Sequence, residues 1–160
     1  MSIPQEFADF WSAALRVTQR LEAGRFYEAF ALGDSAEMAG YLAGLVLEGT
    51  KRATASLAWT YQSNGKPRPK PGDLSILMSW SRRPLCILET TAVDVVAFME
   101  VPAEFALLEG EGDKTLSTWR RNHEVFFARE CARIGRSPSP SMPIVCEHFS
   151  VVYQVPGAAP

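Results

Sequence analysis

The chain has 160 residues with 47% apolar and 21% charged side chains, and its formal net charge is −2 at pH 7. This length fits one domain, and no apolar run approaches the roughly 20 residues that a membrane-spanning helix needs. The negative net charge excludes a global positive field for sequence-independent binding to nucleic acid. Because no basic start precedes an apolar stretch, as it would in a secretory signal, we expect a soluble, cytoplasmic protein without a membrane partner.

The first part of the chain predicts a helix over residues 2–21. Aromatic and apolar residues such as Trp11 recur there at helical spacing, and Ser2 with Gln5 matches a capping box. A minimal sheet domain would not need this helix. We therefore interpret residues 1–24 as an N-terminal helical extension, which would pack on a cleft, shape its mouth or mediate a dimer.

Residues 26–32 are short, apolar and aromatic, and they predict a strand that ends at the turn-forming residues 33–35. Helical spacing resumes after this turn. The pattern predicts a second helix that Asp34 caps, with Glu37 three positions on, and that Gly49 ends.

Period-two alternation predicts a half-buried strand over residues 54–61. The next segment, residues 64–72, contains three prolines and is expected to be a loop. Further β-prone runs predict strands at residues 73–80, 85–91 and 93–98.

A short helix over residues 102–108 leads into a glycine-spaced acidic loop. The longest helix of the C-terminal half follows at 116–134, with Gly135 as its stop. A last strand at 143–155 precedes a tail, 156–160, that we expect to fray. Helices that bracket several short strands, without a repeating strand-helix-strand rhythm, indicate an α+β fold around a curled, mostly antiparallel sheet or small barrel.

Three cysteines, Cys86, Cys131 and Cys146, are too far apart to supply a zinc-binding pair, and their odd number argues against a disulfide framework. We expect them to be buried thiols in a reducing cytoplasm.

Lys51 and Thr54 stand three residues apart, where the second helix ends and a strand begins. A desolvated lysine amine has a lowered pKa and can take the proton of a hydroxyl, which would make Thr54 a nucleophile. The alternative is structural, because a lysine beyond a helix C-terminus interacts with the helix dipole and threonine favours strands. Spacing alone leaves both interpretations open.

Three carboxylates, Glu109, Glu111 and Asp113, are separated by single glycines. An EF-hand calcium loop is excluded, because Lys114 and Arg120 occupy the positions where it needs glycine and glutamate. A magnesium or manganese site on one or two of these carboxylates stays open. The alternative is that Asp113 caps the next helix, Glu111 is solvated and Glu109 turns inward.

Trp119, Arg120 and His123 follow on one predicted helix. Trp119 and His123 share a face at a spacing of four, and most such aromatic pairs belong to a core. In the functional interpretation, Trp119 stacks on a base, Arg120 reaches an anionic or carbonyl group, and His123 hydrogen bonds a substrate edge.

In this order, the motifs Gly49-x-Lys51-x-x-Thr54, Pro71-Gly72-Asp73 and Glu109-Gly110-Glu111-Gly112-Asp113, followed by Trp119-Arg120-x-x-His123, resemble the ASCH domain family in its longer bacterial form. The resemblance extends from about Phe7 to Val155. It implies a small β-barrel similar to the PUA domain, flanked by helices, with a cleft beneath the lysine loop and a role in RNA or nucleoside metabolism.

Some small members of that family are amidohydrolases that remove acyl groups from the N4 amide of modified cytidines. The resemblance carries their catalytic groups over to Lys51, Thr54 and Glu109, with Glu111 as the alternative acid. Lys51 would take the proton of Thr54, Thr54 would attack the acyl carbon, and the glutamate would protonate the leaving amine. This mechanism implies neither a metal nor a cofactor. The substrate-binding residues expected beside this triad are Arg52, Tyr61, Glu111, Trp119, Arg120 and His123.

Two other functions stay open. One family member has been described as a ribonuclease, and here Lys51 and Arg120 would neutralise a scissile phosphate while the acidic loop holds a divalent cation. The third is a non-catalytic RNA-binding module that stacks a base on Trp119 or Tyr61. The expected partner is thus a small modified nucleoside, with single-stranded RNA as the alternative, and the oligomeric state is undetermined.

Overall fold

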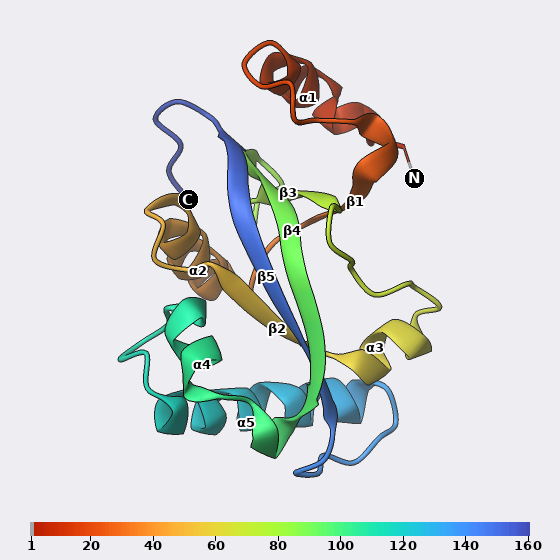
Figure 1. Cartoon of the computed structure of the whole chain (residues 1–160), viewed down its shortest axis with the longest axis vertical. Helices are drawn as coiled ribbons and strands as arrows, with labels where there is room; N and C mark the ends of the chain where they lie inside the picture. Colours follow the sequence, from red (N-terminus) through yellow and green to blue (C-terminus); the bar gives the residue numbers. More distant parts are fainter. Residues whose placement is uncertain (1) are drawn as a thin grey trace.

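A five-stranded sheet with the strand order β1-β3-β4-β5-β2 forms the centre of the computed structural model, which describes residues 2–160 (Figure 1). β1 pairs with β3 in parallel, and the other neighbours are antiparallel. The strands are β1 (Phe26–Phe30), β2 (Ala53–Leu57), β3 (Leu74–Met78), β4 (Pro84–Ala97) and β5 (Pro143–Gln154). The α+β prediction is confirmed. Within residues 2–160 the sheet remains open, with β1 and β2 as its edges, so the expected barrel is not closed.

Helices cover the sheet at both ends of the molecule (Figure 1). The α-helices are α1 (Ala8–Leu15), α2 (Ala36–Leu47), α3 (Ala58–Ser63), α4 (Ala103–Glu109) and α5 (Leu116–Arg133), and short 3-10 turns are η1 (Gln5–Phe7), η2 (Ala23–Arg25) and η3 (Phe98–Glu100). Among the described residues, none of these helices is both long and apolar enough to cross a bilayer.

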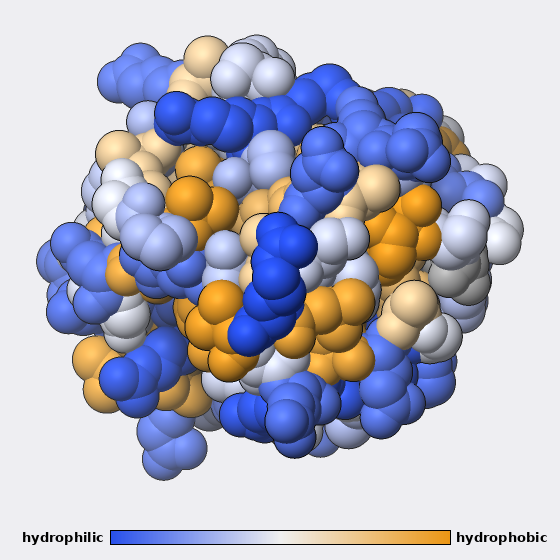
Figure 2. Space-filling model, turned by 90° about the horizontal axis from the view of Figure 1, so that it is seen from above, coloured by the Kyte–Doolittle hydropathy of each residue, from blue (hydrophilic) through white to orange (hydrophobic). Residues whose placement is uncertain are grey.

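The N-terminal extension is less helical than predicted. The 3-10 turn η1 precedes α1, and Pro4 occupies the cap position without a side-chain hydrogen bond, so the capping box of Ser2 and Gln5 does not form. The buried residues of the extension pack on β1, β3 and β4 through a cluster that comprises Phe7, Trp11, Ala14, Leu21, Phe26, Leu74, Ile76 and Ile87. Figure 2 looks onto this end of the molecule, where polar side chains alternate with small apolar patches.

Both long helices are capped one or two residues later than the sequence suggested. Ser35, not Asp34, caps α2, and its hydroxyl accepts a hydrogen bond from the backbone N–H of Met38. Thr115 caps α5, while Asp113 accepts hydrogen bonds from Thr115 instead. A hydroxyl at the cap satisfies a free N–H of the first turn as well as a carboxylate does.

Three strand predictions, at residues 54–61, 85–91 and 93–98, are wrong in their extent. The chain turns after Leu57 into α3, because Tyr61 donates to or accepts from Ser56 at 2.9 Å and the Arg136 guanidinium lies 4.4 Å from the Trp59 ring centre. The predicted strands at 85–91 and 93–98 are one strand, β4, with an irregular register between Thr90 and Ala92. A bulge of this kind bends a strand without ending it.

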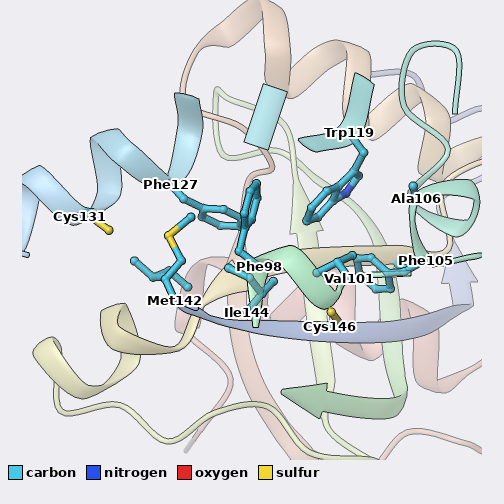
Figure 3. Packing of buried hydrophobic residues seen from close by; sticks show 12 residues of the cluster. Phe98, Val101, Phe105, Ala106, Trp119, Phe127, Cys131, Met142, Ile144 and Cys146 are labelled. Atoms are coloured by element: carbon cyan, nitrogen blue, oxygen red, sulfur yellow. The ribbon is translucent and has the colours of Figure 1, made fainter. Parts of the chain in front are cut away.

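The largest core cluster lies between the sheet and the helices α4 and α5. Phe98, Phe127 and Trp119 pack side by side there, with the Phe98 and Trp119 rings 5.7 Å apart (Figure 3). The three thiols Cys86, Cys131 and Cys146 are buried and unbridged, as predicted. The tail expected to fray contacts the body of the domain, where Arg83 donates to the carbonyl of Ala159 at 2.5 Å.

Candidate active site

Backbone contacts bring the lysine loop and the acidic loop together. The N–H of Arg52 donates to the carbonyl of Leu108 at 2.8 Å. Gly110 ends α4 in the left-handed region at φ +70°, and a Cβ atom there would lie 2.5 Å from the carbonyl oxygen of Thr50. Only glycine fits both the conformation and the close approach. Two segments more than 50 residues apart thereby meet at one point.

Lys51 lies at the centre of the site with its side chain almost fully buried. Its Nζ donates to the Glu109 carboxylate at 2.5 Å, the Ala53 carbonyl at 2.8 Å and the Glu111 carboxylate at 3.2 Å. Burial alone would lower the pKa of Lys51, but the negative charges of Glu109 and Glu111 raise it above its ordinary value. Lys51 is therefore an ammonium ion whose three N–H groups all have acceptors.

Glu109 is the buried counter-charge, with a relative exposure of 1%. Its other oxygen accepts from Trp119 Nε1 at 2.9 Å and lies 3.3 Å from His123 Nε2. Burial would raise the pKa of Glu109, but the Lys51 charge and the hydrogen bond from His123 hold it well below its usual range. Glu109 is thus a fixed carboxylate and not a group that exchanges protons near neutral pH.

His123 is held from both sides of its ring. Nδ1 lies 2.9 Å from the carbonyl of Trp119, and Nε2 faces the Glu109 carboxylate. Both neighbours accept hydrogen bonds, so the imidazolium form satisfies both contacts. Burial lowers the pKa of His123, but the hydrogen bond to Glu109 and its charge raise it above the ordinary value.

Glu111 is the carboxylate of the cluster whose charge changes near neutral pH. Burial, followed by the hydrogen bond and repulsion from Glu109, raises the pKa of Glu111 to about 7, although Lys51 opposes this. A group with a pKa near the working pH can both take and give a proton. Glu111 therefore fits general acid and base chemistry better than Glu109.

A cavity of about 490 Å³ opens onto this cluster, a size that suits a small organic ligand. The loop after β1, together with α2, β2, the acidic loop and α5, forms its wall. The lining residues include Leu32, Gly33, Asp34, Met38, Tyr41, Leu42, Lys51, Thr54, Ala55, Glu109, Glu111, Gly112, Arg121, Asn122, His123, Val125, Phe126 and Arg129. This lining begins at Leu32, so residues 2–24 of the N-terminal extension form no part of it.

Two exposed contacts bridge opposite walls of the cavity. Gly112 of the acidic loop donates its N–H to the Tyr41 hydroxyl of α2 at 3.0 Å. Arg129 of α5 forms an ion pair at 3.0 Å with Asp34, which follows β1. These contacts hold the acidic loop and α5 against α2 and the β1–α2 loop.

The structure brings Lys51, Thr54, Glu109, Glu111 and His123 to this one cavity. The expected proton transfer from Thr54 to Lys51 does not fit the geometry. Among the described residues, Lys51 donates its three hydrogen bonds to Ala53, Glu109 and Glu111, and none to Thr54. The lysine is an ammonium ion with all three protons, so it cannot accept another. The pKa of Lys51 is raised and not lowered, because the negative charges of Glu109 and Glu111 outweigh the effect of burial.

Four other predicted substrate-binding residues, Arg52, Tyr61, Trp119 and Arg120, are outside the lining of this cavity. Trp119 is 4% exposed and packs between His123 and Phe98, so its ring offers no free face to a base (Figure 3). Tyr61 pairs with Ser56. Arg120 donates to the carbonyls of Met99 and Val101, and Arg52 donates to Gly49.

Several lining residues escaped the sequence analysis, above all Tyr41, Arg121 and Arg129. Tyr41 lies on α2 and is 47% exposed. Arg121, Val125 and Arg129 follow one another at intervals of four along α5. Residues at this spacing lie on one face of a helix, so the pattern could have indicated a ligand-facing surface next to the buried face of α5.

Glu109, Glu111 and His123 place one potential ligand atom each within 4.8 Å of one another. These donors suit a divalent cation poorly in the present arrangement. The Lys51 ammonium already binds both carboxylates, and the histidine nitrogen that faces the cluster carries a proton. The Lys51 ammonium thus occupies the position that a metal ion would take between the two carboxylates.

Taken together, an open PUA-like α+β sheet and a largely apolar cavity with a buried lysine and glutamate beneath the lysine loop define the class of this domain. The sequence model of the ASCH domain matches residues 28–153, and the chain belongs to the ASCH domain family. No curated protein matches the chain significantly.

Two crystal structures are similar to the whole chain. An ASCH domain from Lactobacillus crispatus JV V101 is 34% identical with a TM-score of 0.86, and the match covers 95% of this chain and 97% of that one. Protein EF3133 from Enterococcus faecalis V583 is 32% identical with a TM-score of 0.82, and the match covers 91% of this chain and 87% of that one.

Proposed function

We propose that this cavity hydrolyses the amide bond of N4-acylated, cytidine-type nucleosides, and that Glu111 carries the proton. The observation that supports this proposal is the pairing of a buried ammonium with a carboxyl group whose pKa is about 7, in a cavity that Thr54 also lines. Amide hydrolysis needs a nucleophile, a stabiliser for the oxyanion, and an acid for the leaving amine.

In the first step, the Glu111 carboxylate takes the proton of the Thr54 hydroxyl, and Thr54 Oγ1 attacks the acyl carbon. Protonation removes the negative charge of Glu111, which weakens its 3.2 Å contact with Lys51, the longest of the three. One N–H of Lys51 then becomes available to the oxyanion of the tetrahedral intermediate.

In the second step, the bond between the acyl carbon and N4 breaks, and Glu111 returns its proton to the leaving amine. Water, activated by the same carboxylate, hydrolyses the threonine ester and releases the carboxylic acid. Glu109 and His123 keep Lys51 and Glu111 in place throughout, because their own hydrogen bonds are satisfied inside the protein.

The test is turnover of N4-acetylcytidine, followed as the release of cytidine. Thr54→Ala is expected to lower kcat by at least about a hundredfold, while Thr91→Ala, an exposed threonine on β4, keeps the wild-type rate. Full activity of Thr54→Ala would contradict the covalent mechanism. Absence of turnover in the wild-type protein would contradict the proposed function itself.

One observation favours a second candidate, a metal-dependent ribonuclease, because Glu109, Glu111 and His123 have the composition of a cation site. A cation there would have to displace the Lys51 ammonium. Cleavage of short unstructured RNA that stops with a chelator, without action on N4-acetylcytidine, would select this function. Binding of RNA without turnover of either substrate would select a binding module.

A further inference from the structure

The rim of the cavity carries a cation that the proposed reaction does not use. Of the described lining residues, Lys51 is paired with Glu109 and Glu111, and Arg129 is paired with Asp34. Arg121 is exposed and also lines the cavity. Among residues 2–160, no carboxylate lies within 4.0 Å of its guanidinium group to form an ion pair. Its hydrogen bond runs from Nη2 to the Thr118 hydroxyl at 3.3 Å.

The nearest acid does not neutralise Arg121. Asp113 is close enough for the Arg121 charge to contribute to its lowered pKa, but hydrogen bonds from Thr115 and Thr118 are the larger causes. These two residues engage both oxygens of Asp113. The guanidinium of Arg121 thus keeps most of its donors for a group from solvent.

The cavity has a polarity from floor to rim. The floor holds the buried Lys51 and Glu109, where the acyl amide must react, and apolar side chains such as Leu42 and Phe126 line the walls. Arg121 and the neighbouring amide of Asn122 lie on the solvent-exposed face of α5 at the opening. A nucleoside whose base enters amide first directs its sugar, and any phosphate on that sugar, towards this opening.

We propose that Arg121 forms a phosphate subsite, so that the cavity takes a nucleotide in preference to the free nucleoside. Guanidinium groups bind phosphate oxygens in a fork of two parallel hydrogen bonds, and the charge remains at every physiological pH. This inference rests on the proposed function for the identity of the base. The phosphate belongs either to a mononucleotide or to the end of an RNA chain, and both present the same chemistry to Arg121.

Equilibrium binding of the deacylated products tests the subsite without turnover. Calorimetric titration with cytidine, cytidine 5′-monophosphate and cytidine 3′-monophosphate is expected to show at least about tenfold tighter binding of one monophosphate than of cytidine. Arg121→Gln should abolish most of that preference, and Arg121→Lys should restore part of it, since lysine keeps the charge but loses the fork. Arg16→Gln, an exposed arginine of the N-terminal extension, is the matched control and should keep the full preference.

The two sources of phosphate are distinguished by measuring the binding of a cytidine-terminated trinucleotide with and without its terminal phosphate.

Equal binding of cytidine and both monophosphates, or a preference for a monophosphate that survives Arg121→Gln, would overturn the proposed phosphate subsite. If N4-acetylcytidine is hydrolysed but neither monophosphate is preferred, the reaction stands and the subsite fails. If a monophosphate is preferred through Arg121 but no acylcytidine is hydrolysed, the subsite stands and the reaction fails.

Discussion

Two partly buried clusters of acidic residues in this domain each contain a glutamate with a raised pKa, but the clusters differ in their neighbours. In the cavity, Glu111 has its pKa raised to about 7 beside Glu109, with Lys51 between them. On β5, Glu147 also has its pKa raised to about 7, by burial and by the charges of Glu28 and Asp73, while a hydrogen bond from Thr90 opposes the shift.

The difference between the clusters is access. The loop between α3 and β3 passes close to the second cluster, where Lys66 pairs with Glu28 and lies 4.5 Å from the Tyr27 ring centre, and the Tyr27 hydroxyl donates to the Pro67 carbonyl at 2.6 Å. Glu147 is not among the residues that line the cavity, whereas Glu111 is. A raised pKa therefore does not mark a functional site unless a ligand can reach the group.

The largest effect is expected at Glu109. Glu109→Gln leaves the buried Lys51 ammonium without its closest counter-charge, and breaking a buried ion pair from one side costs about 3–5 kcal/mol. We expect that loss in the free energy of unfolding, measured by urea denaturation at pH 7. Glu147→Gln is the matched control and should be neutral or stabilising, because it removes a carboxylate from an acidic environment. Equal destabilisation by both variants would erase the distinction between the clusters.

The next largest effect is expected at Gly110, where comparison with Gly135 separates the cost of a steric overlap from the cost of a left-handed backbone conformation. Gly110→Ala should cost about 2–3 kcal/mol and abolish turnover, because its Cβ would overlap the Thr50 carbonyl and push the two loops apart. Gly135→Ala, at φ +73° with open space around it, should cost only about 1 kcal/mol and leave turnover unchanged. Retained turnover in Gly110→Ala would show that the site does not depend on this contact.

The pH dependence of stability should reveal Glu147. The pKa of Glu147 in the folded protein lies above its ordinary value of 4.5, so the protonated form stabilises the fold, and this contribution is lost as pH rises from about 4.5 through about 7. Removing the titratable group in Glu147→Gln should raise the free energy of unfolding at pH 8 by about 1 kcal/mol relative to pH 5. Parallel stability curves for variant and wild type from pH 5 to 8 would contradict the shifted pKa.

The smallest effect is expected at the contact between Tyr41 and Gly112. Tyr41→Phe removes an exposed hydrogen bond and should cost about 0.5 kcal/mol of stability, yet it should lower kcat/KM severalfold because the acidic loop loses its tie to α2. Tyr153→Phe serves as the control, since Tyr153 packs against Phe10 outside the cavity. A loss of kcat/KM no larger than in this control would mean that the reaction does not depend on the hydrogen bond between Gly112 and Tyr41.

Much of the fold was predictable because periodicity and turn residues report local structure. Each predicted helix has a counterpart in the structure, and the stop at Gly49 and the loop over residues 64–72 were predicted correctly. The sequence misled where tertiary contacts decide, as at α3, whose strand-like alternation is overridden by contacts of Tyr61 and Trp59. Local patterns carry no information on such contacts.

Five residues that the sequence singled out line the cavity, namely Lys51, Thr54, Glu109, Glu111 and His123, but four others do not, and the interactions among the five were not predictable. Family resemblance paired Lys51 with Glu109, which no spacing argument could do across 58 positions. The protonation states follow from the number of carboxylates that surround Lys51, and that number depends on the Gly110 contact. For Trp119 the sequence left a core position and a stacking surface for a base as alternatives, and in the structure it lies in the core and donates to Glu109.

The most direct test of the proposed reaction compares turnover of N4-acetylcytidine by Glu111→Gln and Glu147→Gln. The two carboxyl groups share a raised pKa, but only Glu111 lines the cavity. We predict that Glu111→Gln lowers kcat by about a hundredfold or more while Glu147→Gln retains the wild-type value. Wild-type turnover in Glu111→Gln, or an equal loss in both variants, would contradict the assignment of Glu111 as the proton carrier.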